Sequence, residues 1–312
     1  MKKRGLLFGL IPTLFLIAGC EGFSMEKIFG KKETKAQDVN VIILSGQSNA
    51  VGCKNSLYLK DTMGEEKYNE YNEGYEDVKI AFANYDCDYT SPQRTKTLQN
   101  SSNGKFVKVQ LGQGNVPANF GPEIGMAEEL HSTFSNKLYI IKCACGASNL
   151  NDDWSLSDDV MFQNLKNFVN KQFSNLKNEG LNPILRAFCW MQGEGDSYDK
   201  YCDAYYENLR RLKTNLDREF LKLTENNNLP FIDAGIGMGK NPNTQELEWK
   251  RYAEVNAAKQ DFAALSETNI YFDTISQGLH SDQEPNDFVH YDSESQIKLG
   301  HLFAKAYEPF LK

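Results

Sequence analysis

The chain has 312 residues, of which 40% are hydrophobic and 24% are charged, enough apolar material to bury one large core. Its formal net charge of −8 argues against a protein that binds nucleic acid, because contacts to phosphates require a basic surface. We therefore expect no nucleic-acid partner.

The first twenty residues have the pattern of an export signal. Three basic residues (Lys2, Lys3 and Arg4) precede an apolar run over residues 6–17, which is too short to span a bilayer comfortably. The run Ile17-Ala18-Gly19-Cys20 resembles a bacterial lipobox, in which the cysteine is lipidated and becomes the mature N-terminus. A short transmembrane anchor and a plain secretory signal are the alternatives.

From this pattern we expect residues 1–20 to be a lipoprotein-type signal peptide that ends at Cys20. Residues 21–38 are polar and aperiodic, which predicts a flexible tether between a membrane and a domain at residues 39–312. The expected protein is exported and is anchored to a membrane, at the cell envelope or surface, through its N-terminal lipid.

The remainder of the chain alternates between short apolar runs and segments with helical periodicity, which predicts an α/β fold. We expect a three-layer α/β/α domain with a mostly parallel sheet. The expected strands are 41–44, 78–82, 106–111, 138–143, 184–191, 231–234 and 270–272. The expected helices are 122–134, 158–178, 199–224, 246–264 and 293–310.

Two segments, 52–77 and 84–105, are rich in Asn, Asp, Tyr and Gly and look irregular. We interpret them as one long excursion over the active-site side of the sheet rather than as a second domain. Their aromatic residues are candidates for stacking on sugars: Tyr58, Tyr68, Tyr71, Tyr75 and Tyr85.

Cys143, Cys145 and Cys189 lie in apolar runs, a position typical of buried free thiols, whereas disulfide pairing is left open by the sequence. The chain has no C-x-x-C motif, no H-E-x-x-H motif and no clustered histidines. We therefore expect no metal and no cofactor.

Parallel sheets place ligands beyond the carboxyl ends of their strands, so chemically active residues are expected just after the apolar runs. Ser48 directly follows the first strand, at a turn where backbone amides opening the next helix can donate to an oxyanion. Gly46 permits a close approach of the backbone there. A serine in this place also suits a helix N-cap.

Of the chain's four histidines, His131 and His301 lie in helical stretches, and His280 and His290 lie in the loop before the last helix. Of these two loop histidines, only His290 has a carboxylate three residues earlier, in Asp287-Phe288-Val289-His290. Side chains at positions i and i+3 of a turn can converge, so Asp287 can accept the Nδ1–H of His290 and orient its ring. With Ser48 these residues form a candidate catalytic triad. The alternative is a solvated turn without a catalytic role.

Gly46-Gln47-Ser48-Asn49 near the start and Asp287-x-x-His290 before the last helix resemble the SGNH hydrolase superfamily, which has a flavodoxin-like fold. Intermediate segments resemble the acetylesterases of carbohydrate esterase family 6 and the sialate O-acetylesterases. These segments are 120–125 (FGPEIG), 145–150 (CGASNL) and 190–196 (WMQGEGD), and the motifs together span residues 41–303.

The resemblance implies that the amide of Gly121 and the side-chain amide of Gln192 complete an oxyanion hole with the amide of Ser48. It leaves open whether Gln47, Asn49, Gly146 and Glu194 bind substrate or order the loops. Gly146 is followed by Ala147 where relatives often have a second glycine, which puts the local backbone geometry in doubt.

The function that these features predict is a serine esterase that removes O-acetyl groups from carbohydrates of the acetyl xylan or sialic acid type. The expected mechanism passes through an acyl-enzyme on Ser48. Two alternatives stay open: a non-catalytic carbohydrate-binding module on the same fold, and a lipase or thioesterase of the same superfamily.

Overall fold

A computed structural model describes residues 36–131, 137–285 and 287–311. The compact unit within it runs from Gln37 onward, so its first strand begins two residues before the domain start expected from the sequence. The predicted signal peptide, most of the tether and Cys20 lie outside the described residues. Within the described ranges, none of the helices combines the length and apolarity that a membrane crossing requires.

The central sheet has eight strands in the order β10-β9-β8-β1-β7-β3-β4, with β5 also paired to β3. All neighbours from β10 to β3 are parallel, and β4 and β5 are antiparallel to β3. The bounds are β1 (Gln37–Gly46), β3 (Tyr75–Cys87), β4 (Lys96–Ser101), β5 (Val107–Val109), β7 (Leu138–Gly146), β8 (Leu181–Met191), β9 (Phe231–Ala234) and β10 (Asn269–Phe272). A second sheet pairs β2 (Lys54–Asn55) with β6 (Asn119–Phe120).

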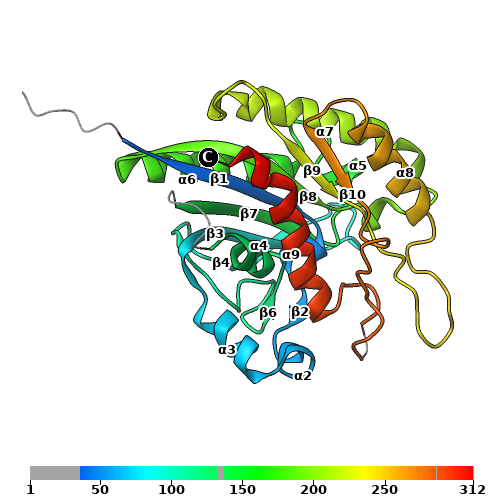
Figure 1. Ribbon diagram of the computed structural model, residues 1–312. Coiled ribbons are helices and arrows are strands. Elements are labelled where there is room, and N and C mark those ends of the chain that lie inside the picture. Colours follow the sequence, from blue (N-terminus) through cyan, green and yellow to red (C-terminus); the bar gives the residue numbers. More distant parts are fainter. Residues whose placement is uncertain (1–35, 132–136, 286, 312) are drawn as a thin grey trace, which may run out of the picture. The chain divides into compact units, whose positions relative to one another are not determined.

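Helices cover both faces of the central sheet, which makes the predicted three-layer arrangement (Figure 1). On one face α4 (Glu123–Leu130) packs against α9 (Ser293–Tyr307). On the other face α6 (Val160–Asn178) packs on β7 and β8, and α7 (Tyr205–Phe220) packs on α8 (Tyr252–Ala263). Shorter helices are α1 (Ser48–Val51), α2 (Tyr58–Met63), α3 (Glu65–Glu73) and α5 (Leu150–Asp153).

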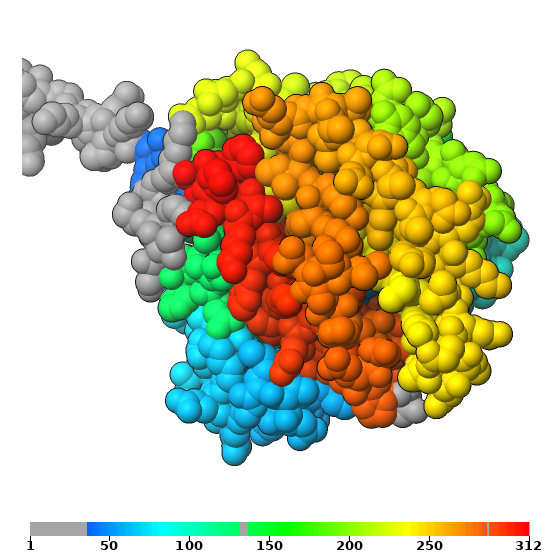
Figure 2. All heavy atoms as spheres, turned by 45° about the vertical axis from the view of Figure 1, so that its right-hand side comes forward, coloured from blue at the N-terminus to red at the C-terminus, as the bar shows by residue number. Residues whose placement is uncertain are grey.

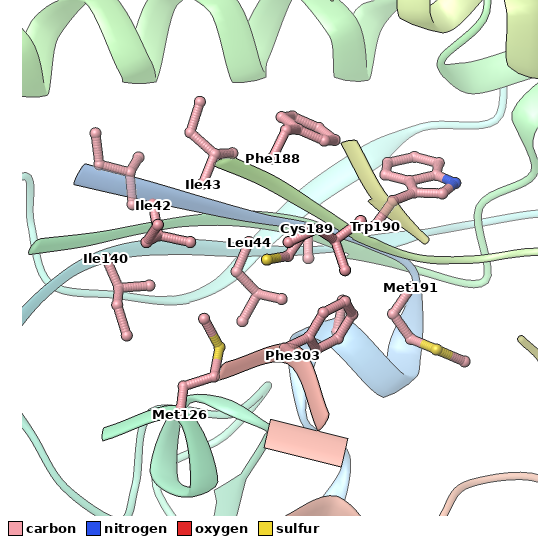
Figure 3. Packing of buried hydrophobic residues seen from close by; sticks show 14 of the residues in the cluster. Ile42, Ile43, Leu44, Met126, Ile140, Phe188, Cys189, Trp190, Met191 and Phe303 are labelled. Atoms are coloured by element: carbon pink, nitrogen blue, oxygen red, sulfur yellow. The ribbon is translucent and has the colours of Figure 1, made fainter. Parts of the chain in front are cut away.

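The core forms because the central strands are apolar on both faces. In β1 every residue from Val39 to Gly46 is buried, as expected of a parallel strand between two helical layers. Ile43 and Phe188 point to one side of the sheet, whereas Leu44 faces the side of Met126 and Phe303, from α4 and α9 (Figure 3).

The predicted elements are largely confirmed, but the interpretation of the two irregular segments was wrong in part. Segment 52–77 contains α2 and α3, and segment 84–105 contains the end of β3 and all of β4. Their polar composition concealed this structure, because α3 and β4 are largely solvent-exposed and lack a long apolar stripe.

Candidate active site

A cavity of about 800 Å³ opens beyond the carboxyl ends of the central strands, where the fold predicts a ligand site. Ser48, Asp287 and His290 all line it, although 239 positions separate Ser48 from Asp287 in the sequence. The cavity therefore brings the three members of the predicted triad to one place.

The turn from β1 to α1 presents Ser48 to this cavity. Gly46 has φ +140°, and a Cβ at this position would lie 1.9 Å from the carbonyl oxygen of Met191. A side chain is therefore excluded there, and the amide of Gln47 donates to the same carbonyl at 2.9 Å. Ser48 is partly exposed between buried neighbours, so its hydroxyl is accessible while its backbone is fixed.

The predicted contact between Asp287 and His290 is present. Nδ1 of His290 lies 3.0 Å from Oδ2 of Asp287, and the backbone amides of Val289 and His290 donate to Oδ1 at 3.2 and 3.1 Å. Burial raises the pKa of Asp287, but the hydrogen bond and charge of His290 and the charge of Lys54 outweigh it and hold this pKa well below its usual range. The carboxylate therefore stays ionised and can orient the imidazole.

Lys54 is a charged partner of this pair that the sequence did not single out. Its Nζ lies 3.2 Å from Oδ2 of Asp287 and 3.3 Å from Oε2 of Glu284, and the lysine side chain is only 2% exposed. Glu284 in turn accepts from the amide of Ser293, in the first turn of α9, at 2.7 Å. A buried chain of charges therefore extends from the imidazole to the last helix.

The thiol of Cys53 also lines the cavity, but it is a poor competitor for the nucleophile's role. Burial, together with the carboxylates of Asp86 and Asp287, raises its pKa to about 12. Because the thiolate is the reactive form, this thiol is unreactive at neutral pH. All six cysteines in the described part of the chain are free thiols, and Cys143, Cys145 and Cys189 are fully buried as predicted.

Gln47 orders the loop that follows β8. Its Oε1 accepts from the amides of Gly193 and Gly195 at 3.3 and 3.0 Å and from Nε2 of Gln192 at 3.3 Å. Of the two roles left open for Gln47, these contacts represent the loop-ordering one, although the residue also borders the cavity.

Gln192 lies elsewhere than the predicted oxyanion hole requires. It is fully buried, and its Nε2 donates to Asp196 as well as to Gln47, while Tyr205 donates to its backbone carbonyl oxygen at 3.1 Å. Asp196 is a strong acceptor that also receives the amide of Leu150 at 2.7 Å. The side chain is thereby drawn into the loop and away from the cavity wall.

Gly121 is also not positioned as predicted. Its amide donates to Oε1 of Glu123 at 3.0 Å, and Oε2 of the same carboxylate pairs with Lys142 at 2.7 Å. Glu123 and Lys142 are both fully buried, so this amide is committed to a buried ion pair instead of facing the cavity. Of the three expected oxyanion donors, Ser48 alone belongs to the cavity wall.

Gly146, at the end of β7, borders the cavity together with Ser48. A Cβ at Gly146 would lie 2.7 Å from Oδ1 of Asp86, the residue opposite it in β3. The lack of a side chain therefore keeps this wall open between the nucleophile and Asp86. Ala147, which stands where relatives often have a second glycine, has φ +53°. The left-handed backbone conformation therefore lies at Ala147 and not at Gly146.

Asn49 and Glu194 are buried behind the cavity. Nδ2 of Asn49 donates to Oε1 of Glu194 at 2.8 Å, and burial raises the pKa of Glu194. Oε2 of Glu194 is a buried oxygen with no hydrogen-bond partner among the described residues. These contacts assign both residues to the ordering of the loops rather than to the wall of the cavity.

Aromatic side chains form much of the remaining wall: Tyr85, Tyr89, Tyr198, Tyr201 and Trp249. Tyr198 and Trp249 pack edge to face with ring centroids 6.1 Å apart. The segment near residues 240–250 that carries Trp249 lies beside the segment near 270–290 (yellow and orange in Figure 2).

Among the five tyrosines predicted to stack on sugars, Tyr85 alone lines the cavity. Tyr71 and Tyr75 are buried in the core, and Tyr68 packs against it, because they belong to α3 and to the start of β3. The prediction was therefore wrong for these three, and Tyr58, in α2, does not line the cavity either. Sequence reasoning also missed Lys54 and Arg94, since single charged residues in a polar segment carry no pattern that reveals distant partners.

Comparison with known proteins agrees with this architecture. The family model for carbohydrate esterases described as sialic acid-specific acetylesterases matches residues 38–309. Among curated proteins, none matches this chain.

The solved structures that are similar to this chain include the following three. A protein from Arabidopsis thaliana is 19% identical with a TM-score of 0.57, and the match covers 87% of this chain and 99% of that protein's chain. NanS is 13% identical with a TM-score of 0.58, and the match covers 88% of this chain and 98% of the NanS chain. A carbohydrate acetylesterase from Xanthomonas citri is 15% identical with a TM-score of 0.50, and the match covers 86% of this chain and 56% of the acetylesterase chain. At these identities the likeness shows a shared fold.

Proposed function

The chain belongs to the sialic acid-specific acetylesterase family of carbohydrate esterases and is a carboxylic ester hydrolase, and we propose that it removes O-acetyl groups from carbohydrates through a Ser-His-Asp acyl-enzyme mechanism. The observation that carries the proposal is the cavity that Ser48 and His290 share, together with the contact between Asp287 and Nδ1 of the His290 imidazole. This is the arrangement that activates a serine hydroxyl for acyl transfer.

In the first step Oγ of Ser48 attacks the acetyl carbonyl carbon while Nε2 of His290 takes the hydroxyl proton. The tetrahedral intermediate collapses as the C–O bond to the sugar breaks, and His290 returns the proton to the sugar oxygen. Water then attacks the acetyl-enzyme with His290 again as base, and acetate leaves as Ser48 regains its proton. Ionised Asp287 stabilises the imidazolium in both steps.

The oxyanion of each intermediate needs hydrogen-bond donors close to Ser48. We assign this role to the amides of Ser48, just after β1, and of Gly146, the last residue of the adjacent parallel strand β7, because both residues border the same cavity. This assignment replaces Gly121 and Gln192, whose N–H groups are bound to Glu123, Asp196 and Gln47.

The cavity wall supports a sugar as the leaving alcohol. Aromatic rings such as Tyr198 and Trp249 can pack on the apolar face of a pyranose, and their polar edges can bind its hydroxyls. The backbone of Asp86 is paired in the sheet, but its side chain makes no hydrogen bond or ion pair with the described residues, so its carboxylate is available to sugar hydroxyls.

The test is acetate release from 4-nitrophenyl acetate, acetylated xylan and O-acetylated sialic acid, compared with a Ser48→Ala variant. We expect release on at least one acetylated sugar that disappears in the variant. Equal inactivity of both proteins on all three substrates, with retained binding of glycan, would instead support a binding module on the same fold.

We also propose that Cys20 carries a lipid that anchors the exported protein to a membrane, on the strength of the run Ile17-Ala18-Gly19-Cys20 after the apolar stretch. Mass spectrometry of the mature N-terminus tests this. An unmodified N-terminus, or one that retains residues 1–19, would disprove it.

A further inference from the structure

We propose that two hollows beside the catalytic cavity form a subsite for a second, neutral sugar, with the ring of Phe288 as its binding surface. The enzyme would then prefer an acetylated sugar that is linked to such a neighbour over the same acetylated sugar alone. The proposal rests on the proposed function, because the subsite adjoins the cavity that holds Ser48. It adds a binding site outside the triad and its oxyanion donors.

The two hollows adjoin the catalytic cavity. They have volumes of about 520 and 570 Å³ and lie between the turn at residues 241–250 and the loop that carries His290. The first hollow shares Glu248 with the catalytic cavity, and the second shares Asp287 with it. Both are bordered by Phe288. The three spaces are therefore neighbours, and the two hollows meet at this ring.

The proposed mechanism places the acetylated sugar against the same loop. Nε2 of His290 must reach the sugar oxygen to protonate it as the leaving group, so the sugar ring lies on the His290 side of the acetyl carbonyl. A second sugar linked to this ring is then close to the hollows, because Phe288 precedes His290 by two residues in the loop.

Phe288 is an apolar side chain without a place in the core. It is partly exposed, and it belongs neither to the hydrophobic core of the described residues nor to the side chains packed against that core. Its backbone is held in place, because the carboxylate of Asp287 accepts from the next two amides, those of Val289 and His290. A fixed and partly exposed aromatic ring is suited to pack on the apolar face of a pyranose.

The turn opposite Phe288 is preformed by its own hydrogen bonds. Oδ1 of Asn241 accepts from the amides of Asn243 and Thr244 at 2.9 and 3.2 Å. The amide of Asn241 donates to the carbonyl of Glu246 at 2.9 Å. The side chain of Asn243 borders the second hollow and has no hydrogen-bond partner in the described ranges, so its amide is available to a sugar hydroxyl. Because the turn is already ordered, little conformational entropy is lost when a sugar binds.

The charges around the hollows favour a neutral sugar. Glu246 and Glu248 border the first hollow, and Asp282 borders the second. Of the described residues that line the two hollows, Lys250 is the only cation. The excess of carboxylates repels an anionic sugar, whereas the same carboxylates can accept hydrogen bonds from the hydroxyls of a neutral one.

The kinetic test uses two pairs of substrates that differ only in the neutral sugars attached to the acetylated one. The first pair is singly O-acetylated xylotriose and O-acetylated xylose, and the second is O-acetylated sialyllactose and O-acetylated sialic acid. On at least one pair we expect the wild type to have a kcat/KM about tenfold higher on the longer substrate, as for one aromatic contact with its hydrogen bonds. Phe288→Ala should abolish this preference, and Phe288→Trp, which keeps an aromatic ring, should retain it.

The ratio of the two kcat/KM values is the readout, because damage to the neighbouring triad lowers both values by the same factor. Arg210→Gln, an exposed change on α7, is the matched control expected to keep the ratio. Equal kcat/KM values within both pairs would overturn the proposal. A preference that survives Phe288→Ala but is lost in Tyr89→Ala would also overturn it, because the second sugar would then lie at the exposed ring of Tyr89 on another part of the cavity wall.

A binding measurement keeps the test independent of turnover. In the Ser48→Ala variant, calorimetry should find xylotriose bound about tenfold more tightly than xylose, or sialyllactose than sialic acid, and the additional Phe288→Ala change should remove the difference. Release of acetate that requires Ser48 but is equal on both members of each pair would overturn this proposal alone and leave the esterase function intact. The lack of any release that depends on Ser48 would instead overturn the esterase function, and the calorimetric comparison would still decide on the subsite.

Discussion

The side chain of Asn49, the residue after the candidate nucleophile, accepts a hydrogen bond from the backbone amide of Tyr291, the residue after the candidate catalytic histidine, at 3.0 Å. The same oxygen accepts from Nε2 of Gln296 in α9 at 3.0 Å, while Nδ2 donates to Glu194. One buried amide therefore sets the position of the histidine loop relative to the nucleophile.

We predict that Asn49→Ala lowers both stability and turnover. The change leaves the buried amide of Tyr291 without its partner, which costs about 1–3 kcal/mol, and it frees the histidine loop. Urea denaturation should record the loss of unfolding free energy, and kcat on 4-nitrophenyl acetate should fall with little change in KM. Thr214→Ala, an exposed change on α7, is the control expected to leave both unaltered. Normal kcat in a destabilised Asn49→Ala protein would show that the hydrogen bond is structural alone.

Neutral substitutions at Lys54 and at Glu284 should shift the acidic limb of the pH profile of kcat/KM in opposite directions. Lys54→Met removes the positive charge 3.2 Å from Asp287, so the carboxylate stabilises the protonated imidazole more strongly. The acidic limb of kcat/KM then shifts to higher pH, by about one pH unit. Glu284→Gln removes a negative charge 3.3 Å from Lys54 and should shift the limb to lower pH.

The opposite signs separate an electrostatic role from a merely structural one, because disrupted packing would lower the rate at every pH. Lys54→Arg, which keeps the charge, should leave the limb near its original position. Shifts in the same direction for Lys54→Met and Glu284→Gln would contradict the role assigned to this charge chain.

The sequence revealed those parts of the fold that are apolar over several consecutive residues. The strand predicted at 231–234 coincides with β9, because a strand covered on both faces needs such a run. β4 was missed, since its residues (Lys96 to Ser101) are polar apart from the exposed Leu98, and all of them are partly or fully exposed at the edge of the sheet. The Asp287–His290 contact was predictable because it is local, with the partners three positions apart in the sequence.

The oxyanion donors were harder to predict, because a glycine or glutamine in a motif does not reveal what its N–H groups already bind. Gly121 is bound to Glu123, and Gln192 to Asp196, four residues away. Lys54 and Arg94 meet their partners only after folding, over separations of 233 and 59 residues. Such long-range contacts leave no periodic signal in a single sequence.

A double-mutant cycle distinguishes the loop-ordering role of Gln192 from a direct catalytic one. If Gln192 acts through Asp196, then Gln192→Ala and Asp196→Ala should lower kcat by similar factors, and the double variant should be no worse than either. A direct oxyanion donor would instead lose about a hundredfold or more in kcat in Gln192→Ala alone, with a mild effect of Asp196→Ala. Steady-state kinetics on 4-nitrophenyl acetate decide between the two patterns.

Asp196 should also make the stability of the protein depend on pH. Burial raises its pKa from 3.8 to about 7, against the hydrogen bonds from Leu150 and Gln192 that lower it. Between these two pKa values the folded protein holds a proton that the unfolded chain has lost, so stability falls as the pH rises, by at most about 1.4 kcal/mol per pH unit. Above the folded pKa this contribution is fully lost.

The Asp196→Asn variant lacks this titration and therefore isolates it. We expect the unfolding free energy of the wild type, relative to that of the variant, to decrease from pH 5 to pH 7 and to level off near pH 8, as measured by urea denaturation at each pH. A difference that is constant across this range, or that grows with pH, would mean that Asp196 is ionised in the folded protein already at pH 5. In that case the hydrogen bonds from Leu150, Asn151 and Gln192 outweigh the cost of burying the charge.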